Sequence, residues 1–178
     1  ERWEQLIKKN EDELLIALNW QGNPGAETTQ SRGRSIPLAK LIKLSKVDKV
    51  KFVSLQKGFG TEQLTNEIQE EFFVSCQSEI SAAMPFEDNA AIISVCDLMI
   101  SSDTGIAHLC GALGKPLWLL LSKVPEWRWG PNGECTFWYP GMRVFKQDVR
   151  GDWDRVMEEV VSALTELQNR RAKPYSKA

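Results

Sequence analysis

The residues with the clearest chemical potential are Asp103, Thr104 and Gly105. They follow an apolar segment and precede a stretch with helical spacing of apolar residues. The first amides of a helix have no intrahelical partners, the helix dipole favours negative charge there, and a glycine lets a phosphate approach closely. The pattern therefore predicts an anion site at the start of a helix. The alternative is that Asp103 or Thr104 simply caps the helix.

The elements around this turn alternate between strand and helix. We expect strands at Leu14–Trp20, Val50–Leu55, Phe72–Cys76, Leu98–Ile100, Leu117–Leu121 and Val144–Phe145, and helices at Pro37–Leu44, Thr61–Glu70, Asp88–Val95, Ile106–Leu113 and Trp153–Leu167. This alternation predicts an α/β fold, a Rossmann-like parallel sheet with helices on both faces. Because ligands of such sheets bind at the carboxyl ends of the strands, the loops at Gly22, Lys57 and Asp103 should converge on one phosphate-bearing ligand.

Composition restricts the function classes. The 178 residues suffice for one domain, and a formal net charge of −2 gives no basic excess that would favour nucleic acid. The longest apolar run, 116–121, is too short to span a bilayer. Cys76, Cys96, Cys110 and Cys135 are dispersed without a CxxC pair, which favours a reduced, cytoplasmic setting. With a single histidine as well, no metal site is expected.

Several segments resemble the donor-binding domain of heptosyltransferase-type glycosyltransferases, and of the related domains that follow tetratricopeptide repeats in bacterial proteins. They occur in the family's order at Leu18–Pro24, Arg34–Leu38, Phe52–Gly58, Ile100–Trp118, Pro125–Phe145 and from Gly151. The resemblance implies the C-terminal half of a GT-B fold, with a nucleotide-sugar-binding domain at 14–168. Residues 1–13 would form a lead-in helix or boundary segment, and residues 169–178 a mobile tail.

The resemblance also implies a phosphate site. Asp103, Thr104 and Gly105 would hold the diphosphate of a nucleotide-sugar, and His108 would face the phosphates or the ribose. The Ser101–Thr104 turn supplies a single carboxylate and no DxD motif, which is consistent with a metal-independent glycosyltransferase. The resemblance also implies that the enzyme is inverting. The alternative for His108 is that it packs in a small gap beside Gly111.

Three further residues complete the implied donor site. Lys57 would neutralise phosphate charge, Arg34 would lie beside the sugar or phosphate, and Gln56 would meet the nucleoside. The alternative for Lys57 and Arg34 is that they are ordinary surface charges. The aromatic residues between Trp127 and Tyr139 either stack on a ligand or fill a satellite core, and packing is the favoured interpretation.

The first lobe of such an enzyme binds the acceptor and normally supplies the general base, so this chain alone is expected to bind donor but to turn over little or not at all. One alternative is a non-catalytic nucleotide- or sugar-binding module. Another is a dinucleotide-dependent oxidoreductase, suggested by Gly58-Phe59-Gly60, although Gln63 stands where that motif has its third glycine.

Overall fold

A parallel sheet forms the centre of the computed structural model, which describes residues 1–27, 33–82, 85–130 and 138–172. Its strands are β1 (Leu14–Asn19), β2 (Val50–Ser54), β3 (Leu98–Ser102), β4 (Leu117–Leu121) and β5 (Met142–Lys146). The order is β2-β1-β3-β4-β5, and every neighbouring pair is parallel. The strand order therefore reverses between β1 and β3, which is where ligands bind in doubly wound sheets. The predicted Rossmann-like α/β fold is confirmed.

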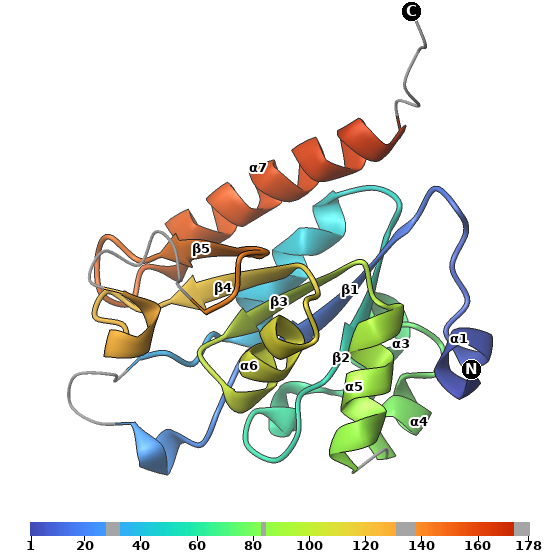
Figure 1. Cartoon of the computed structure of the whole chain (residues 1–178), viewed down its shortest axis with the longest axis horizontal. Helices are drawn as coiled ribbons and strands as arrows, with labels where there is room; N and C mark the ends of the chain where they lie inside the picture. Colours follow the sequence, from blue (N-terminus) through green and yellow to red (C-terminus); the bar gives the residue numbers. More distant parts are fainter. Residues whose placement is uncertain (28–32, 83–84, 131–137, 173–178) are drawn as a thin grey trace, which may run out of the picture.

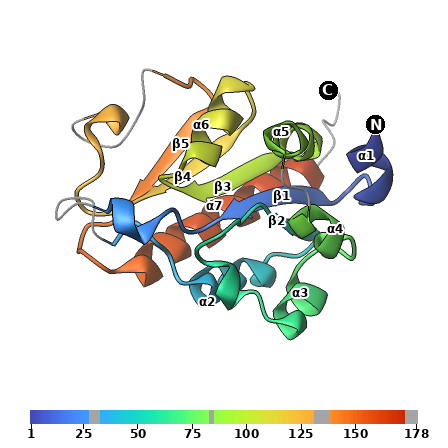
Figure 2. The same ribbon diagram turned by 90° about the horizontal axis from the view of Figure 1, so that it is seen from below.

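Helices cover both faces of this sheet (Figures 1 and 2). The α-helices are α1 (Arg2–Leu6), α2 (Leu38–Leu41), α3 (Asn66–Phe72), α4 (Gln77–Ala82), α5 (Phe86–Val95), α6 (Gly105–Ala112) and α7 (Trp153–Ala172). Short 3₁₀ turns are η1 (Pro24–Ala26), η2 (Ile42–Lys46), η3 (Thr61–Gln63) and η4 (Trp127–Trp129). Figure 2 shows α2 and α7 on one face and α5 and α6 on the other. None of the described helices is both long enough and apolar enough to cross a membrane.

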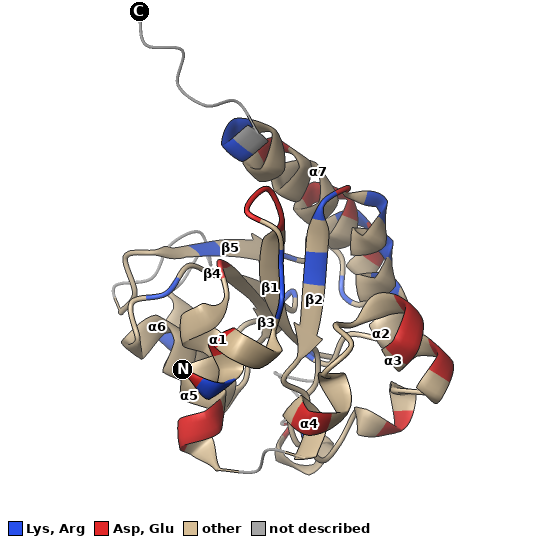
Figure 3. Cartoon of the chain, turned by 90° about the vertical axis from the view of Figure 1, so that its right-hand side faces the viewer, with Lys and Arg blue, Asp and Glu red and all other residues tan. Residues whose placement is uncertain are grey.

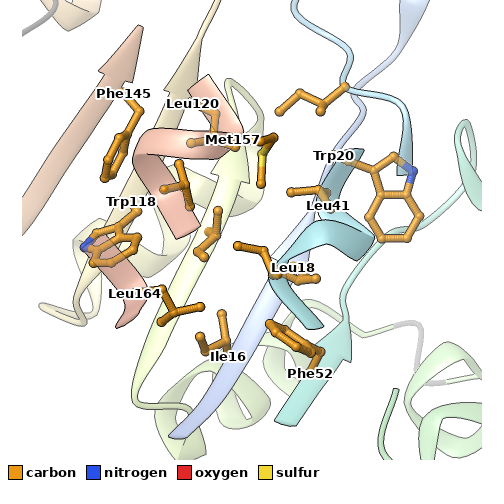
Figure 4. Packing of buried hydrophobic residues seen from close by; sticks show 14 of the residues in the cluster. Ile16, Leu18, Trp20, Leu41, Phe52, Trp118, Leu120, Phe145, Met157 and Leu164 are labelled. Atoms are coloured by element: carbon orange, nitrogen blue, oxygen red, sulfur yellow. The ribbon is translucent and has the colours of Figure 1, made fainter. Parts of the chain in front are cut away.

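The core divides into two layers because successive strand residues point to opposite faces. In β1, Ile16 and Leu18 pack with α2 and α7, whereas Leu15 and Ala17 pack with the helices of the other face. Figure 4 shows Ile16 and Leu18 in the first layer, together with Met157 of α7. All residues of β1, β3 and β4 are buried, as expected for strands covered on both sides.

The predicted strand at Phe72–Cys76 is wrong. Only an isolated bridge joins Phe73 to Phe52, and Phe72 is the last residue of α3. Helix α3 begins at Asn66, later than the predicted start at Thr61, because Thr65 caps it. The side chain of Thr65 accepts a hydrogen bond from the amide of Ile68 at 3.3 Å. The helix predicted from Thr61 is therefore a 3₁₀ turn followed by α3.

The other helices follow the sequence pattern with shifted ends. Asp152 accepts a hydrogen bond from the amide of Arg155 at 3.2 Å at the start of α7, and α7 continues to Ala172, beyond the predicted end at Leu167. Helix α5 begins at Phe86, two residues before the predicted start at Asp88, and the carboxylate of Asp88 accepts a hydrogen bond from Nε1 of Trp3 at 2.9 Å.

Acidic and basic residues are mixed over the side of the molecule shown in Figure 3. Acidic residues lie on α3 and α4, and basic residues lie on β2 and at the end of α7.

Candidate functional site

The strand-order switch brings together three segments that are distant in the sequence. A Cβ placed on Gly22, just after β1, would lie 3.4 Å from Cγ2 of Thr104 and 3.5 Å from Nη2 of Arg34. Gly22 thus lets the guanidinium of Arg34 and the start of α6 approach the same point. Two of the predicted site residues, Arg34 and Thr104, are neighbours in the structure.

The start of α6 is not closed by its own cap. Thr104 is the N-cap residue, yet its side chain makes no capping hydrogen bond. Its hydroxyl donates instead to Oδ1 of Asn19 at 3.0 Å and lies 3.2 Å from Oγ of Ser101. A Cβ added to the exposed Gly105 would meet nothing within 4 Å, so α6 is open to solvent at its first residue. Side-chain capping by Thr104, the alternative raised by the sequence, is absent.

Asp103 directly precedes the N-cap residue of α6. Its side chain is buried, with 6% exposure, directly before the N-cap. Its negative charge acts on His108, where it opposes the effect of burial on the histidine pKa. Asp103 therefore belongs to the turn that leads into α6, and its role at a diphosphate stays a prediction.

Arg34 is held by a carboxylate that the sequence did not reveal. Its Nε lies 3.7 Å from Oε1 of Glu27, and its Nη2 donates to the carbonyl of Asn23 at 3.2 Å. Glu27 also accepts hydrogen bonds from the amide of Gly33 and the hydroxyl of Ser35, both at 3.0 Å. Arg34 is thus a largely buried, oriented cation rather than an ordinary surface charge.

Gln56 has a structural role in this geometry. Its Oε1 accepts from the amides of Trp20 and Gln21 at 2.9 and 3.0 Å. Its Nε2 donates to the carbonyls of Gln21 and Phe59, both at 2.6 Å. These four bonds occupy both donors and both acceptor positions of the amide. They join the loops that follow β1 and β2, and they do not favour the predicted nucleoside contact.

The ammonium group of Lys57 is hydrogen-bonded to the last turn of α4. Its Nζ donates to the carbonyls of Ile80 and Ser81, both at 2.7 Å, in the last turn of α4. Burial lowers the pKa of Lys57, and the nearby Asp88 partly opposes this shift. A lysine at a helix C-terminus satisfies carbonyls that lack intrahelical donors. These contacts do not bring its ammonium to Arg34 and Thr104.

His108 lies in an aromatic cluster on α6. Its Nδ1 is 3.0 Å from Oη of Tyr139, and its ring stacks on Trp129 with 4.7 Å between ring centroids. Burial lowers the pKa of His108; Arg128 adds to this effect and Asp103 opposes it. Packing of Trp129 and Tyr139 against α6 agrees with the favoured interpretation of the aromatic segment.

The same segment also exposes large aromatic rings. Trp127 is 76% exposed and Trp138 is 59% exposed. Phe137 and Cys135 lie outside the described residues. A hollow of about 400 Å³ follows β4 and β5, lined by Lys123, Val124, Pro125, Trp127, Gly130 and Lys146.

The alternative of a dinucleotide-dependent oxidoreductase loses support from the described residues. The Gly58-Phe59-Gly60 loop follows β2, an edge strand, rather than the switch between β1 and β3, so it is poorly placed for a dinucleotide.

Cys76, Cys96 and Cys110 are free and buried, and burial raises the pKa of Cys96 and Cys110 to about 12. No group of three metal-ligating side chains occurs in the part of the chain that the structure describes.

Comparison with known protein sequences finds a family match over part of this chain. Residues 50–136 match the sequence model of glycosyltransferase family 9 (heptosyltransferase). Protein FlbA of Caulobacter vibrioides is 30% identical over 125 residues, which cover 66% of this chain and 20% of FlbA. The site residues Gln56, Lys57, Asp103, Thr104, Gly105 and His108 lie within the matched range, whereas Arg34 precedes it.

Two solved structures share the fold. Escherichia coli ADP-heptose LPS heptosyltransferase II matches with a TM-score of 0.61 and 15% identity, over 97% of this chain and 51% of that protein. The family 9 glycosyl transferase of Veillonella parvula matches with a TM-score of 0.60 and 15% identity, over 96% of this chain and 52% of that protein. The chain thus spans about half the length of these structures. It has the Rossmann-like fold of a GT-B glycosyltransferase domain, and its residues 50–136 match glycosyltransferase family 9 (heptosyltransferase).

Proposed function

We propose that this chain is the donor-binding lobe of a metal-independent, inverting glycosyltransferase. The observation that carries the proposal is the convergence of Arg34 and the uncapped start of α6 at the strand-order switch. A nucleotide-sugar would place its diphosphate there, against the first backbone amides of α6 and the guanidinium of Arg34. Guanidinium groups and helix N-termini both suit phosphate oxygens.

The chemistry of sugar transfer explains why this arrangement would favour the reaction. The leaving group is a nucleoside diphosphate, so negative charge grows on the phosphates as the glycosidic bond breaks. Donors fixed in advance around that charge stabilise the transition state. Arg34, oriented by Glu27, and the amides of α6 can supply this stabilisation without a metal ion.

We further propose that an acceptor-binding lobe, preceding this domain in the full protein, faces the carboxyl ends of the strands. The exposed rings of Trp127 and Trp138 and the hollow beside them support this, because large exposed aromatic surface marks a contact area. The general base that activates the acceptor would belong to that lobe.

The buried free thiols suit a reducing, cytoplasmic setting.

Nucleotide binding tests the proposal directly. ADP, UDP, GDP and CDP are titrated into the chain by calorimetry, with and without EDTA, and the thermal shift is recorded. At least one diphosphate should bind equally well with EDTA. Arg34→Ala should weaken that binding about tenfold or more, as loss of a charge-assisted bond costs about 1.5–3 kcal/mol.

The matched control is Lys46→Ala, which removes an exposed positive charge at the end of η2 and should leave affinity unchanged. Binding of none of the four diphosphates, or equal affinity in the Arg34 and Lys46 variants, contradicts the proposal.

The competing function is a non-catalytic nucleotide- or sugar-binding module that retains the same site. The two are separated in the full protein by incubating it with the nucleotide-sugar of the best-binding diphosphate. Release of that diphosphate supports the transferase, and binding without release supports the module.

A further inference from the structure

Tyr139 is seated directly on α6 because Gly111 has no side chain. A Cβ placed on Gly111 would stand 2.4 Å from Cγ of Tyr139 and 2.6 Å from both Cδ atoms, distances that no real Cβ tolerates. From this position Tyr139 reaches His108, one helical turn earlier, with 3.0 Å between Oη and Nδ1. The two rings meet edge to face, with 5.8 Å between centroids.

The imidazole of His108 is fixed from two sides. Trp129, whose side chain is fully buried, stacks nearly parallel to it at an interplanar angle of 19°. Tyr139 occupies Nδ1, and none of the described residues makes a hydrogen bond to Nε2. His108 lies three residues after Gly105, on the same side of α6 as the open first turn.

We propose that Tyr139 is a positioning residue: it donates its hydroxyl hydrogen to Nδ1 of His108 and so holds the imidazole as the Nε2–H tautomer. A neutral imidazole has one donor and one acceptor, so an accepting Nδ1 leaves the proton on Nε2. That Nε2–H then donates a hydrogen bond to an anion bound at the start of α6. The opposite tautomer would present a lone pair, which repels phosphate oxygens.

The neighbouring charges agree with a neutral imidazole. Burial lowers the pKa of His108, and Arg128 lowers it further, while Asp103 acts in the other direction. A neutral ring needs a fixed tautomer to present a donor, whereas a protonated ring would present one on both nitrogens. The hydroxyl of Tyr139 is the group that fixes it.

The chain carries a single histidine, so the imidazole ¹⁵N signals report on His108 without further assignment. Two-bond ¹H–¹⁵N spectra of the full chain at neutral pH should show Nε2 protonated and Nδ1 accepting a hydrogen bond. Tyr139→Phe should move both signals toward the tautomer mixture of a free imidazole. Gly111→Ala should do the same with every polar group retained, because it displaces the ring of Tyr139.

Thr165→Val is the control, since it removes an exposed hydroxyl from α7, on the other face of the sheet from α6, and should leave both signals unchanged. Circular dichroism checks that each variant is folded. If Gly111→Ala unfolds, Tyr139→Phe decides the matter alone. A protonated Nδ1 in the wild type, or identical ¹⁵N signals in Tyr139→Phe and the wild type, overturns the positioning role.

The ligand part of the proposal rests on the function proposed above and has its own readout. Titration with the best-binding of ADP, UDP, GDP and CDP should shift the Nε2 signal of the wild type, and Tyr139→Phe should weaken the binding of that nucleotide roughly three- to tenfold. Unchanged affinity in Tyr139→Phe overturns the donor role of Nε2. If none of the four nucleotides binds the wild type, the donor-lobe proposal fails, whereas the tautomer assignment in the free protein stands.

Discussion

The hydroxyl of Thr104 donates a hydrogen bond to Oδ1 of Asn19 over 3.0 Å, and so joins the N-cap of α6 to the last residue of β1. The two residues are 85 positions apart in the sequence. Because β1 and β3 are the strands between which the order reverses, this bond fixes the geometry of the candidate site.

Replacing Thr104 by valine keeps the shape of the side chain and removes the hydroxyl. The buried Oδ1 of Asn19 then loses its donor, so the free energy of unfolding should fall by about 1–3 kcal/mol. Affinity for the nucleoside diphosphate should fall as well, because the start of α6 is no longer anchored to β1. Urea denaturation and calorimetry measure the two effects. Thr104→Ser keeps the hydroxyl and should restore both; a valine variant equal to the wild type in both measurements would refute the anchoring role.

Glu27 should affect ligand binding only through Arg34. Glu27→Ala removes the carboxylate that lies 3.7 Å from Nε of Arg34 and that holds Gly33 and Ser35. The guanidinium is then less well oriented, and affinity for the diphosphate should fall severalfold. A double-mutant cycle checks this: in an Arg34→Ala background, Glu27→Ala should change affinity little. Additive losses would mean that Glu27 acts independently of Arg34.

The family resemblance implies that Lys57 neutralises phosphate charge, whereas its contacts imply that it stabilises the end of α4. Lys57→Met keeps the aliphatic stem and removes the ammonium that the carbonyls of Ile80 and Ser81 accept from. We expect the free energy of unfolding to fall by about 1–3 kcal/mol, with diphosphate affinity unchanged. Thermal denaturation and calorimetry measure the two quantities. A loss of affinity similar to that of Arg34→Ala, with stability retained, would instead assign Lys57 to the phosphate.

Asp97 should make stability depend on acid pH. Burial alone would raise the pKa of Asp97, but hydrogen bonds from the Leu15 amide, Lys9 and Arg171 outweigh it and leave the pKa below its ordinary value. A carboxyl whose folded pKa is depressed stabilises the protein above its unfolded pKa of about 4, and this contribution is lost as pH falls through the folded pKa.

Asp97→Asn should therefore lower the free energy of unfolding at pH 7, by about 1–3 kcal/mol, and the difference from the wild type should shrink toward pH 3. Urea denaturation at the two pH values measures it. Glu166→Gln is the matched control, because that carboxylate is exposed on α7 and should give no such pH-dependent difference. An equal difference at both pH values would exclude the charge of Asp97 as its cause.

The sequence by itself determined the features that depend on neighbouring residues. Apolar runs marked β1, β2, β3 and β4, and helical periodicity marked α6 and α7. These signals are local because side-chain direction repeats with the period of the element. The order of strands and helices was enough to predict the parallel sheet, and with it the edge where the site lies.

Only the tertiary structure decided which side chains meet there. The bonds of Gln56 to the amides of Trp20 and Gln21, and those of Lys57 to the end of α4, span 23 to 36 residues of sequence, and no local pattern reveals such partners. The same holds for Glu27 with Arg34 and for Tyr139 seated on Gly111. Phe72 and Phe73 had strand-like composition, yet the cap at Thr65 and packing against Phe52 made Phe72 the end of a helix. Burial and hydrogen-bond satisfaction across the whole fold choose among conformations that local propensity leaves nearly equal in free energy.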